Sequence, residues 1–326
     1  MKVLVTGGTG FIGSRLVERL VQQGHEVRLV AKDRLNSVFL ESLGIELVLG
    51  DLNDGMNLDA MVEDAECIYH LAGMVRARFN RDYYEGNYLA TKNFLKVCAR
   101  SSKNLKRFVF VSSLAAAGPS RNGKLLTEDA PCRPVSHYGR SKMLAEEEVL
   151  RYRDKLPVTI VRPSAVYGPR DREMYQYILL VKKHLQPLVG FGTKWLNLIY
   201  VDDLAEGLLL AGEHPNAEDE TFFIASEAPY ATAEMGNAIA AILDLRPIPI
   251  HIPHFVVFSV GAIGEGIAKL TGKPIFFTIQ KARESVQPGW ICSVQKAKSR
   301  LGFSQRVSLL EGMRRTYRWY EESGWL

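Results

Sequence analysis

Tyr138 and Lys142 are the residues whose types and spacing point most directly to chemistry. They stand four positions apart in a segment with a helical pattern, which places the phenol and the ammonium on one face of a helix. A free phenol has a pKa of about 10, so its phenolate needs roughly 4 kcal/mol of stabilisation before it forms near neutral pH. Neighbouring positive charges such as that of Lys142 can supply it. Tyr138 is therefore a candidate proton donor or acceptor.

Ser113 is the third candidate catalytic residue, because it directly follows the apolar run 108–112. If that run is a strand, the hydroxyl lies at the carboxyl edge of a sheet, where ligands of open α/β proteins bind. There it could hold a substrate oxygen while a hydride moves. A Tyr-x-x-x-Lys pair alone also occurs on many helix surfaces, but its combination with Ser113 and a glycine turn is specific.

Three glycines near the N-terminus, Gly7, Gly10 and Gly13, follow the apolar run 3–5 and open the helical pattern 11–23. The first permits a sharp turn, the second lets the backbone approach a pyrophosphate, and the third lets the helix pack against the strand. The phosphates would lie at the positive N-terminus of the helix. At the first strand-to-helix junction this spacing predicts a dinucleotide site; the alternative is a plain tight turn.

The residues after the apolar run 27–30 bear on which dinucleotide binds. NAD binders carry a carboxylate at this strand end, where it accepts the ribose hydroxyls and repels a 2′-phosphate. Ala31 takes that position here, and Lys32 and Arg34 follow as cations, so we expect NADP(H). Asp33 keeps NAD(H) as the alternative, since a rotation of the loop could present it to the ribose. Lys32 and Arg34 could also be solvated loop charges.

The elements that must position these residues alternate between short apolar runs and longer helical patterns. Six apolar runs are predicted strands: 3–5, 27–30, 45–49, 67–71, 108–112 and 158–161. A parallel strand can be rejoined only by a crossover, so continuous apolar strands separated by helices indicate parallel pairing with both faces covered. The sequence therefore predicts an α/β fold built on a doubly wound parallel Rossmann sheet.

The alternation weakens after Gly168, and a smaller, mainly helical C-terminal lobe is predicted there. The expected elements are a helix at 174–185, a strand at 197–201, a helix at 203–210, and mainly helices after 229 with turns at 246–253 and 271–274. We assign residues 1–167 and 194–226 to the dinucleotide-binding domain. Residues 168–193 and 227–326 are expected to form the substrate-binding lobe.

Composition excludes several classes of protein. With 41 Lys and Arg against 36 Asp and Glu, the chain of 326 residues has a net charge of +5 without a basic block, so nucleic-acid binding has no support. Its four cysteines are far apart and no histidine stands at ligand spacing, so we expect neither a disulfide framework nor a metal site. The apolar N-terminal stretch is too short for a signal peptide, which favours the cytoplasm.

The stretch 247–264 carries no acidic or basic side chain, and its length approaches that of a membrane-spanning helix. Pro247, Pro249 and Pro253 interrupt its first half, however, so no span is predicted. The remaining apolar run, 255–263, is expected to form a buried or half-buried helix. The alternatives are an apolar wall of the substrate pocket and a patch that contacts a membrane surface.

Together these motifs resemble the extended short-chain dehydrogenases/reductases of the NAD(P)-dependent epimerase/dehydratase superfamily. The resemblance covers nearly the whole chain, through Thr6-Gly7-x-x-Gly10-x-x-Gly13, Gly50-Asp51-Leu52, His70-Leu71-Ala72-Gly73, Asn87, Ser112-Ser113, Tyr138-x-x-x-Lys142, Arg162-Pro163-x-x-Val166-Tyr167-Gly168-Pro169 and Tyr200-Val201-Asp202-Asp203-Leu204-Ala205. It implies a catalytic triad of Ser113, Tyr138 and Lys142, with Lys142 also gripping the nicotinamide ribose. His70 is expected to be a satisfied core histidine.

The resemblance also implies which residues hold the dinucleotide. Asp51 and Leu52 would contact the adenine, Ala72 and Gly73 would stack at a strand end, and residues 163–166 would contact the nicotinamide. The expected cofactor contacts are Gly7, Thr9, Gly10, Phe11, Ile12, Gly13, Lys32, Arg34, Asp51, Leu52, Leu71, Ala72, Gly73, Asn87, Tyr138, Lys142, Pro163, Ala165 and Val166.

Two positions bear on the branch of the family. Nucleotide-sugar epimerases and dehydratases commonly carry an Asn before the Val-Tyr-Gly-Pro turn and an Arg before the Tyr-Val-Asp-Asp strand, and this chain has Ala165 and Leu196 there. Losing both removes charge-assisted bonds to a diphosphate worth roughly 1.5 to 3 kcal/mol each. Arg170, Arg172 or Lys194 could substitute for them.

The C-terminal part, at 270–274, 297–303 and 317–326, is similar to bacterial relatives of 3β-hydroxysteroid dehydrogenases. We therefore expect hydride transfer between a nicotinamide and a secondary alcohol or ketone of a hydrophobic or uncharged, sterol-like small molecule. The alternatives are a nucleotide-sugar epimerase or dehydratase and a non-catalytic dinucleotide-binding protein, which usually lacks part of the triad. Two further partners of the chain are possible: a membrane surface, contacted peripherally, and a second copy of the chain in a homodimer.

Overall fold

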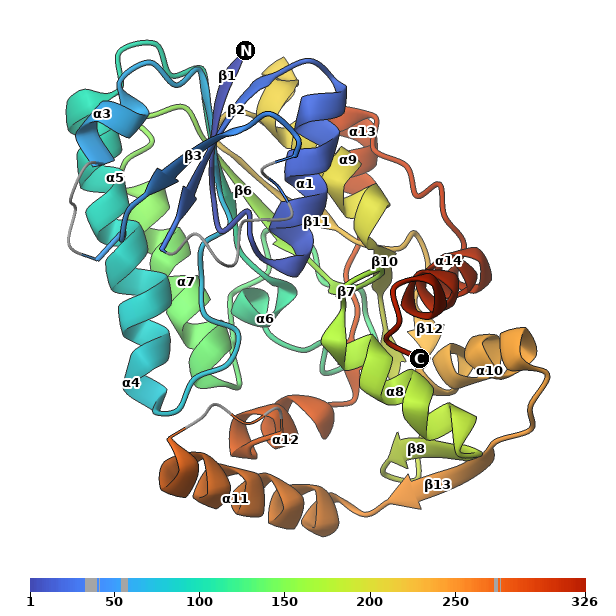
Figure 1. The fold of residues 1–326 in the computed structure, drawn as a ribbon. Helices are drawn as coiled ribbons and strands as arrows, with labels where there is room; N and C mark the ends of the chain where they lie inside the picture. Colours follow the sequence, from blue (N-terminus) through green and yellow to red (C-terminus); the bar gives the residue numbers. More distant parts are fainter. Residues whose placement is uncertain (33–39, 41, 54–57, 273–274, 276) are drawn as a thin grey trace.

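The computed structural model describes residues 1–326 except 33–39, 41, 54–57, 273–274 and 276 (Figure 1). Helices enclose a central sheet in the upper part of the view, and a smaller group of helices and short strands lies below it. The chain begins at the top, on the central sheet, and ends beside the lower group.

A seven-stranded sheet forms the centre, in the order β11-β6-β5-β4-β1-β2-β3, and every neighbouring pair in it is parallel. Its strands are β1 (Lys2–Thr6), β2 (Glu26–Ala31), β3 (Glu46–Leu49), β4 (Cys67–His70), β5 (Arg107–Val111), β6 (Val158–Pro163) and β11 (Glu220–Ile224). The order reverses between β1 and β4, and ligands of doubly wound sheets bind at the carboxyl ends of such strands. The predicted doubly wound parallel Rossmann sheet is confirmed.

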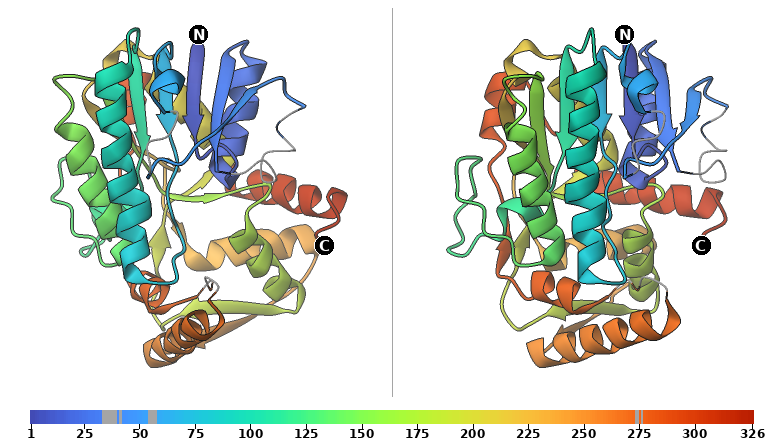
Figure 2. Two further views of the ribbon diagram at one scale, coloured as in Figure 1. Left: turned by 60° about the vertical axis from the view of Figure 1, so that its left-hand side comes forward. Right: turned by 90° about the vertical axis from the view of Figure 1, so that its left-hand side faces the viewer.

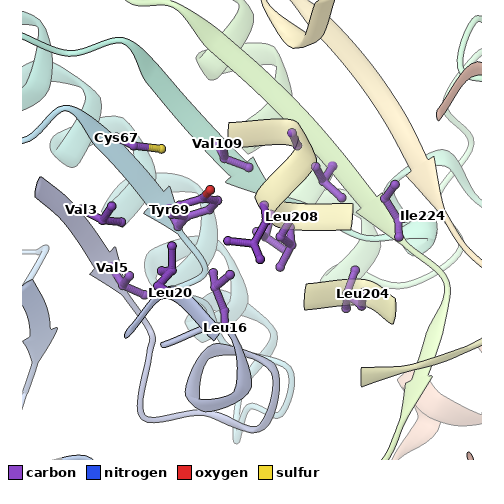
Figure 3. Close-up of a cluster of buried hydrophobic side chains, with 14 of the residues drawn as sticks. Val3, Val5, Leu16, Leu20, Cys67, Tyr69, Val109, Leu204, Leu208 and Ile224 are labelled. Carbon is purple, nitrogen blue, oxygen red and sulfur yellow. The ribbon is translucent and has the colours of Figure 1, made fainter. Parts of the chain in front are cut away.

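Helices cover both faces of this sheet, as continuous apolar strands require. One face carries α1 (Phe11–Gln22), α9 (Val201–Glu213) and α13 (Gln295–Leu301), and the other carries α3 (Leu58–Val62), α5 (Ala90–Ser101) and α7 (His137–Leu150). Successive strand residues point to opposite faces. Val3 and Val5 pack with Leu16 and Leu20 of α1 (Figure 3), whereas Leu4 packs with the helices of the other face.

The lower group combines helices with short strands. Its helices are α8 (Arg172–Lys182), α10 (Thr232–Leu243), α11 (His254–Thr271), α12 (Ile279–Ser285) and α14 (Leu309–Glu322). Its small sheets pair β7 (Ala165–Tyr167) with β10 (Leu198–Tyr200), β8 (Leu185–Val189) with β13 (Ile248–Ile252), and β9 (Trp195–Leu196) with β12 (Tyr230–Ala231) and β14 (Gly289–Trp290). Short helices α4 (Asn80–Tyr83), η2 (Tyr84–Leu89), α6 (Leu114–Ala117) and η3 (Pro215–Ala217) lie in connections of the main sheet.

The segment 246–253, predicted as a turn because of its prolines, instead contains strand β13, which pairs in parallel with β8. Ile248 donates its N–H to the His184 carbonyl at 2.8 Å, so the next nitrogen along the strand, that of Pro249, faces away from β8. An edge strand tolerates a proline at a position whose N–H would have no partner. The expectation of a turn was wrong for this reason.

Helix α11 contains the apolar run 255–263, and only a narrow stripe of it is buried. The buried residues are Val257, Gly261, Gly264 and Ala268. Phe255 is 72% exposed and Ile263 is 63% exposed, so the run does not form an interior substrate wall. Of the helices in the described ranges, none has the length and apolar character needed to cross a bilayer.

Candidate active site

The glycine turn joins β1 to α1, and the fold itself needs two of its glycines. Gly7 has a φ of +74°, and a Cβ there would lie 2.5 Å from the Ala72 nitrogen. A Cβ on Gly13 would collide with the Gly7 carbonyl oxygen. Gly10 has a φ of −78°, and its Cβ would meet only that same oxygen, at 3.3 Å. No described residue therefore requires a glycine at position 10, which leaves the close approach of a ligand as the reason.

The first turn of α1 presents backbone N–H groups at this glycine turn. The N-cap of the helix is Gly10, which has no side chain to accept from them. The first N–H groups of any helix lack partners within it, and here they belong to Phe11, Ile12 and Gly13. Such a helix terminus binds phosphate. The turn therefore fits the pyrophosphate of a dinucleotide.

Three further strands end at the same edge of the sheet as β1. β4 is followed by residues 71–73, β5 by Ser112 and Ser113, and β6 by Ser164. The Oγ atoms of Ser112 and Ser164 are buried and have no hydrogen-bond partner among the described residues. A buried hydroxyl without a partner costs free energy. These two orphaned atoms fit a polar ligand that lies across the strand ends, as a nicotinamide dinucleotide would.

Asn87 holds the segment after β4 in place. It lies in the π-helix η2 and is fully buried. Its Oδ1 accepts from the Met74 N–H at 2.5 Å, while its Nδ2 donates to the Met74 carbonyl at 3.1 Å and to the Ser141 hydroxyl at 2.8 Å. A Cβ on Gly73 would lie 2.9 Å from the Asn87 Oδ1. Asn87 therefore fixes the backbone around Gly73, and both polar atoms of its amide form hydrogen bonds within the chain.

His70 is a core histidine whose two ring nitrogens are both hydrogen-bonded. The Thr91 hydroxyl donates to the Asn87 carbonyl at 2.6 Å, so it accepts from His70 Nε2 at 2.9 Å. His70 Nδ1 then accepts from the Thr6 hydroxyl at 2.7 Å. Burial lowers the pKa of His70 to about 3. The ring is therefore neutral and ties β1 and β4 to α5 without exchanging protons.

Ser113, Tyr138 and Lys142 come together at the end of β5. Ser113 is the N-cap of α6, where its Oγ accepts from the Ala115 N–H at 3.1 Å, and its hydroxyl acts to lower the pKa of Tyr138. Lys142 lies one turn along α7 from Tyr138 and is buried. Its Nζ donates to the Val111 carbonyl at 2.7 Å and lies 4.2 Å from the centre of the Phe110 ring. The structure thus brings the three predicted catalytic residues to one strand end.

Burial governs the proton affinities of Tyr138 and Lys142. It raises the pKa of Tyr138 to about 12, and the hydrogen bond with Ser113 opposes that rise only in part. Burial also lowers the pKa of Lys142 to about 7. Near neutral pH the phenol therefore holds its proton, while Lys142 exchanges its proton readily. In this arrangement Tyr138 could donate a proton, and Lys142 could then stabilise the negative charge left on the phenolate.

Helix α12 closes one side of the site. Ser136, just before α7, donates its hydroxyl to Glu284 of α12 at 2.6 Å. The rings of Tyr83 and Tyr138 meet edge to face with their centres 6.2 Å apart. These contacts were not predicted, because Glu284 is far from Tyr138 in the sequence and no local motif marks it.

Charged side chains of three separate segments gather beside Tyr138. Glu173 pairs with Arg76 at 3.4 Å and with Lys281 at 3.2 Å. The charges of Glu284 and Glu173 both contribute to raising the pKa of Tyr138. Charged groups of α8 and α12 therefore border this side of the site.

Comparison with known proteins identifies the family. Residues 3–225 match the model of the NAD dependent epimerase/dehydratase family. The chain belongs to this family. It is an oxidoreductase of the extended short-chain dehydrogenase/reductase type, as its motifs predicted, and the enzyme class is confirmed.

Individual relatives extend along the whole chain. A ceramide reductase of Caulobacter vibrioides is 31% identical over 99% of this chain and 96% of its own length. A sterol-4-alpha-carboxylate 3-dehydrogenase, decarboxylating, of Mus musculus is 23% identical over 97% of this chain and 90% of its own length. The solved UDP-glucuronic acid 4-epimerase of Bacillus cereus, in complex with UDP-glucuronic acid and NAD, covers 99% of this chain and 100% of its own, with a TM-score of 0.80 at 22% identity. That likeness shows the shared fold alone.

The cofactor preference of this epimerase/dehydratase-family enzyme depends on a segment that is described only in part. Ala31 ends β2 and is buried, so the strand end carries no carboxylate. Lys32 is exposed, and its Nζ pairs with Asp51 Oδ2 at 2.9 Å. Asp33 and Arg34, which also entered the sequence argument, lie outside the described residues. Lys32, which we expect to contact a 2′-phosphate, is therefore paired with Asp51 in this structure. Asp51 is the residue that we expect near the adenine.

The remaining expected contacts divide between the core and the sheet edge. Leu52 and Pro163 are buried, and Leu52 belongs to the core beneath α3 and α5. The expected contacts left at least partly open at the edge are Thr9, Leu71, Ala72, Ala165 and Val166.

Two of the three cations that could replace a diphosphate clamp are already engaged. Arg170 pairs with Glu18 at 2.8 Å and donates to the Ser14 hydroxyl at 3.0 Å, which binds it to α1. Lys194 donates to two backbone carbonyls, those of Ser285 and Gln287, at 2.8 and 3.2 Å. Neither side chain could hold a diphosphate without giving up these bonds.

Proposed function

We propose that this enzyme reduces a ketone to a secondary alcohol on an apolar, lipid-like molecule, with NADP(H) favoured and NAD(H) as the alternative. The observation that carries the proposal is the placement of Ser113, Tyr138 and Lys142 at the end of β5, at the sheet edge that also holds the orphaned hydroxyls of Ser112 and Ser164. A phenol keeps its proton at neutral pH and can give it to a substrate oxygen, and the ammonium of Lys142, one helix turn away, can stabilise the phenolate that forms.

Each residue of the triad then has one task. Ser113 orients the substrate carbonyl, and Tyr138 donates its proton to the carbonyl oxygen. The dinucleotide, when bound, supplies the hydride to the carbonyl carbon. Lys142 stabilises the phenolate that is left, and solvent returns the proton. The residues proposed to hold the dinucleotide are the backbone of the glycine turn, the segment 71–73 and the segment 163–166.

The substrate class follows from what the site lacks and from the relatives. Ala165 and Leu196 replace the diphosphate ligands of nucleotide-sugar enzymes, and Arg170 and Lys194 are bound elsewhere. The names of the ceramide reductase and of the sterol dehydrogenase both describe oxidoreductases of lipids. The charged side chains of Glu173 and Lys281 lie on one side of the site. A large apolar substrate that carries a polar group beside its ketone would suit such a site.

We also propose that the chain divides into a dinucleotide-binding part and a substrate-binding part. We assign substrate binding to residues 168–193 and 227–326. The support is that Glu173 of α8 and Glu284 of α12 both lie beside Tyr138, whereas the glycine turn and Lys142 belong to the other part.

A substrate panel tests the proposed function. Purified protein is incubated with NADPH and, in separate reactions, an N-acylated long-chain ketone, a 3-ketosteroid and UDP-glucose, and products are identified by mass spectrometry. We expect an alcohol from at least one of the apolar ketones, and one NADPH consumed for each alcohol formed. A parallel reaction supplies UDP-glucose with NAD+ or NADP+ as the hydride acceptor. Interconversion of UDP-glucose with its epimer there, without net consumption of the dinucleotide, would overturn the proposal.

A further inference from the structure

Helix α11 and strand β13 lie along the lower edge of the molecule (Figures 1 and 2). Both elements carry exposed apolar side chains. They include Phe255, Ile263, Ile267 and Leu270 of α11 with Ile248 and Ile250 of β13, which are between 41% and 89% exposed. We call these six residues the α11 face. The four residues of α11 share the side of the helix opposite its buried stripe, and exposed apolar side chains gathered on one side indicate an interaction surface.

The way α11 packs explains why its large residues face outward. A Cβ on Gly261 would lie 3.0 Å from the Thr278 carbonyl oxygen, and a Cβ on Gly264 would collide with that of Phe277. Small residues thus let the helix backbone rest directly on the chain that leads into α12. Glu265 and Lys269 are the acidic and basic residues of α11, and they pair with each other at 3.2 Å.

Basic side chains stand at both ends of the α11 face. Lys182, Lys183, Asp244 and Arg246 are exposed and precede the paired strands β8 and β13 by two to four residues. Lys269 and Glu265 lie in the second half of α11, and Arg78 contacts that half. Arg78 is fixed at that end, because it donates to the Lys269 carbonyl at 3.2 Å. Among these residues the cations outnumber the carboxylates at each end, so each end of the α11 face favours an anionic surface.

The α11 face also lies next to the candidate active site. The segment after α11 leads into α12, whose Glu284 accepts the hydroxyl of Ser136 at 2.6 Å and whose Lys281 pairs with Glu173. An apolar molecule leaving a bilayer beneath α11 would therefore meet α12, the wall of the Tyr138 site, first.

We propose that the α11 face docks the enzyme on an anionic lipid bilayer, with α11 lying in the membrane surface. This inference rests on the proposed lipid-like substrate, which would partition into that bilayer. A helix with an apolar outer side and flanking cations binds such an interface through buried apolar area and attraction to anionic headgroups. A second copy of the chain fits less well, because both ends of the face are basic and pairing would bring like charges together.

Vesicle flotation tests the docking. We expect the full-length protein to float with phosphatidylcholine vesicles containing about 30% phosphatidylglycerol, and less with phosphatidylcholine alone, because the flanking cations add attraction. The triple variant Phe255→Ser, Ile263→Ser, Leu270→Ser should bind the anionic vesicles at least about 10-fold more weakly, since three large apolar groups no longer enter the interface. Lys182→Glu with Lys183→Glu should remove the preference for anionic vesicles.

A matched control replaces three other exposed leucines that lie away from α11, in Leu125→Ser, Leu150→Ser, Leu310→Ser; these are 44%, 41% and 41% exposed. It should float as the unmodified protein does. The docking is overturned if the unmodified protein stays unbound, or if both triple variants lose binding equally. It is also overturned if ultracentrifugation shows a dimer that the α11 variant alone dissolves while vesicle binding is unchanged.

A second assay separates this inference from the proposed function. Reduction of the water-soluble ketone ethyl acetoacetate in vesicle-free buffer should be the same in the unmodified protein and in the α11 triple variant. Reduction of a long-chain ketone embedded in anionic vesicles should fall at least about 10-fold in that variant, because docking limits access. If vesicles bind but no ketone is reduced, the proposed function fails alone; if lipid ketones are reduced in detergent but vesicles do not bind, the docking fails alone.

Discussion

The ammonium of Lys142 donates to the carbonyl oxygen of Val111 at 2.7 Å, at the last residue of strand β5. The strand end that carries Ser113 therefore also holds the cation that would stabilise a negative charge on Tyr138. Burial lowers the pKa of Lys142 to about 7, so the fold holds a cation that solvent would stabilise better. A cation held at this cost indicates a functional role rather than a contribution to stability.

This burial makes a prediction about stability and pH. The pKa of Lys142 is about 7 in the folded protein and is near 10.4 in an unfolded chain. Between these values the unfolded chain binds more protons, so the free energy of unfolding rises with pH there. Lys142→Met lacks this rise, so its stability relative to the unmodified protein should be more favourable at pH 7 than at pH 10, by up to a few kcal/mol.

Urea unfolding of both proteins at the two pH values measures the difference. Lys124→Met, which removes an exposed lysine, is the matched control. Its free energy of unfolding should differ from that of the unmodified protein by the same amount at pH 7 and at pH 10. An offset for Lys142→Met that does not change with pH would show that the buried ammonium is not destabilised as described.

The glycine turn gives a second prediction, based on a pair of substitutions. Gly13→Ala should lower the free energy of unfolding by several kcal/mol, because its Cβ collides with the Gly7 backbone. Gly10→Ala should fold with a change of about 1 kcal/mol or less, since its Cβ meets only one atom at 3.3 Å. It should nevertheless weaken dinucleotide binding more than about 10-fold, because the methyl group occupies the approach of the pyrophosphate.

Thermal unfolding without added dinucleotide, followed by calorimetric titration with NADPH, measures both effects. Tight binding of NADPH by Gly10→Ala would mean that the dinucleotide does not lie against this turn.

The choice of dinucleotide is the third prediction. Lys32→Ala should weaken NADPH by about 10-fold, the value of one lost charge-assisted bond, and leave NADH almost unchanged. Ala31→Asp should shift the preference toward NADH, because the new carboxylate accepts the ribose hydroxyls and repels a 2′-phosphate. Calorimetry on the unmodified protein supplies the baseline, and tighter binding of NADH than of NADPH there would reject the NADP(H) preference.

Much of the sheet and the triad could be predicted because the signals are local. The strand, turn and helix around Gly7 follow from a short stretch of sequence, and the spacing of Tyr138 and Lys142 fixes their shared helix face. The parallel pairing of the sheet followed from the alternation of apolar runs with helical patterns, since parallel strands need crossovers. Its order and its seventh strand, β11, were not predicted.

The parts that could not be predicted depend on contacts between distant segments. Glu173 and Glu284 reach Tyr138 only through the packing of α8 and α12. The apolar pattern of α11 does not say which side meets the protein, and small residues, Gly261 and Gly264, decided it. Strand β13 was missed because its prolines resemble a turn until an edge strand is available to pair with.

The most direct test of the account follows deuterium from labelled NADPH into a product, comparing the unmodified protein with Tyr138→Phe. The unmodified protein should place deuterium on the carbinol carbon of an apolar alcohol. Tyr138→Phe should lower that rate at least about 1,000-fold while binding NADPH almost as tightly, because it removes the proton donor alone. Tyr177→Phe, which removes another buried hydroxyl without a described partner, is the matched control and should keep full activity. Deuterium transfer by Tyr138→Phe at the unmodified rate would contradict the account.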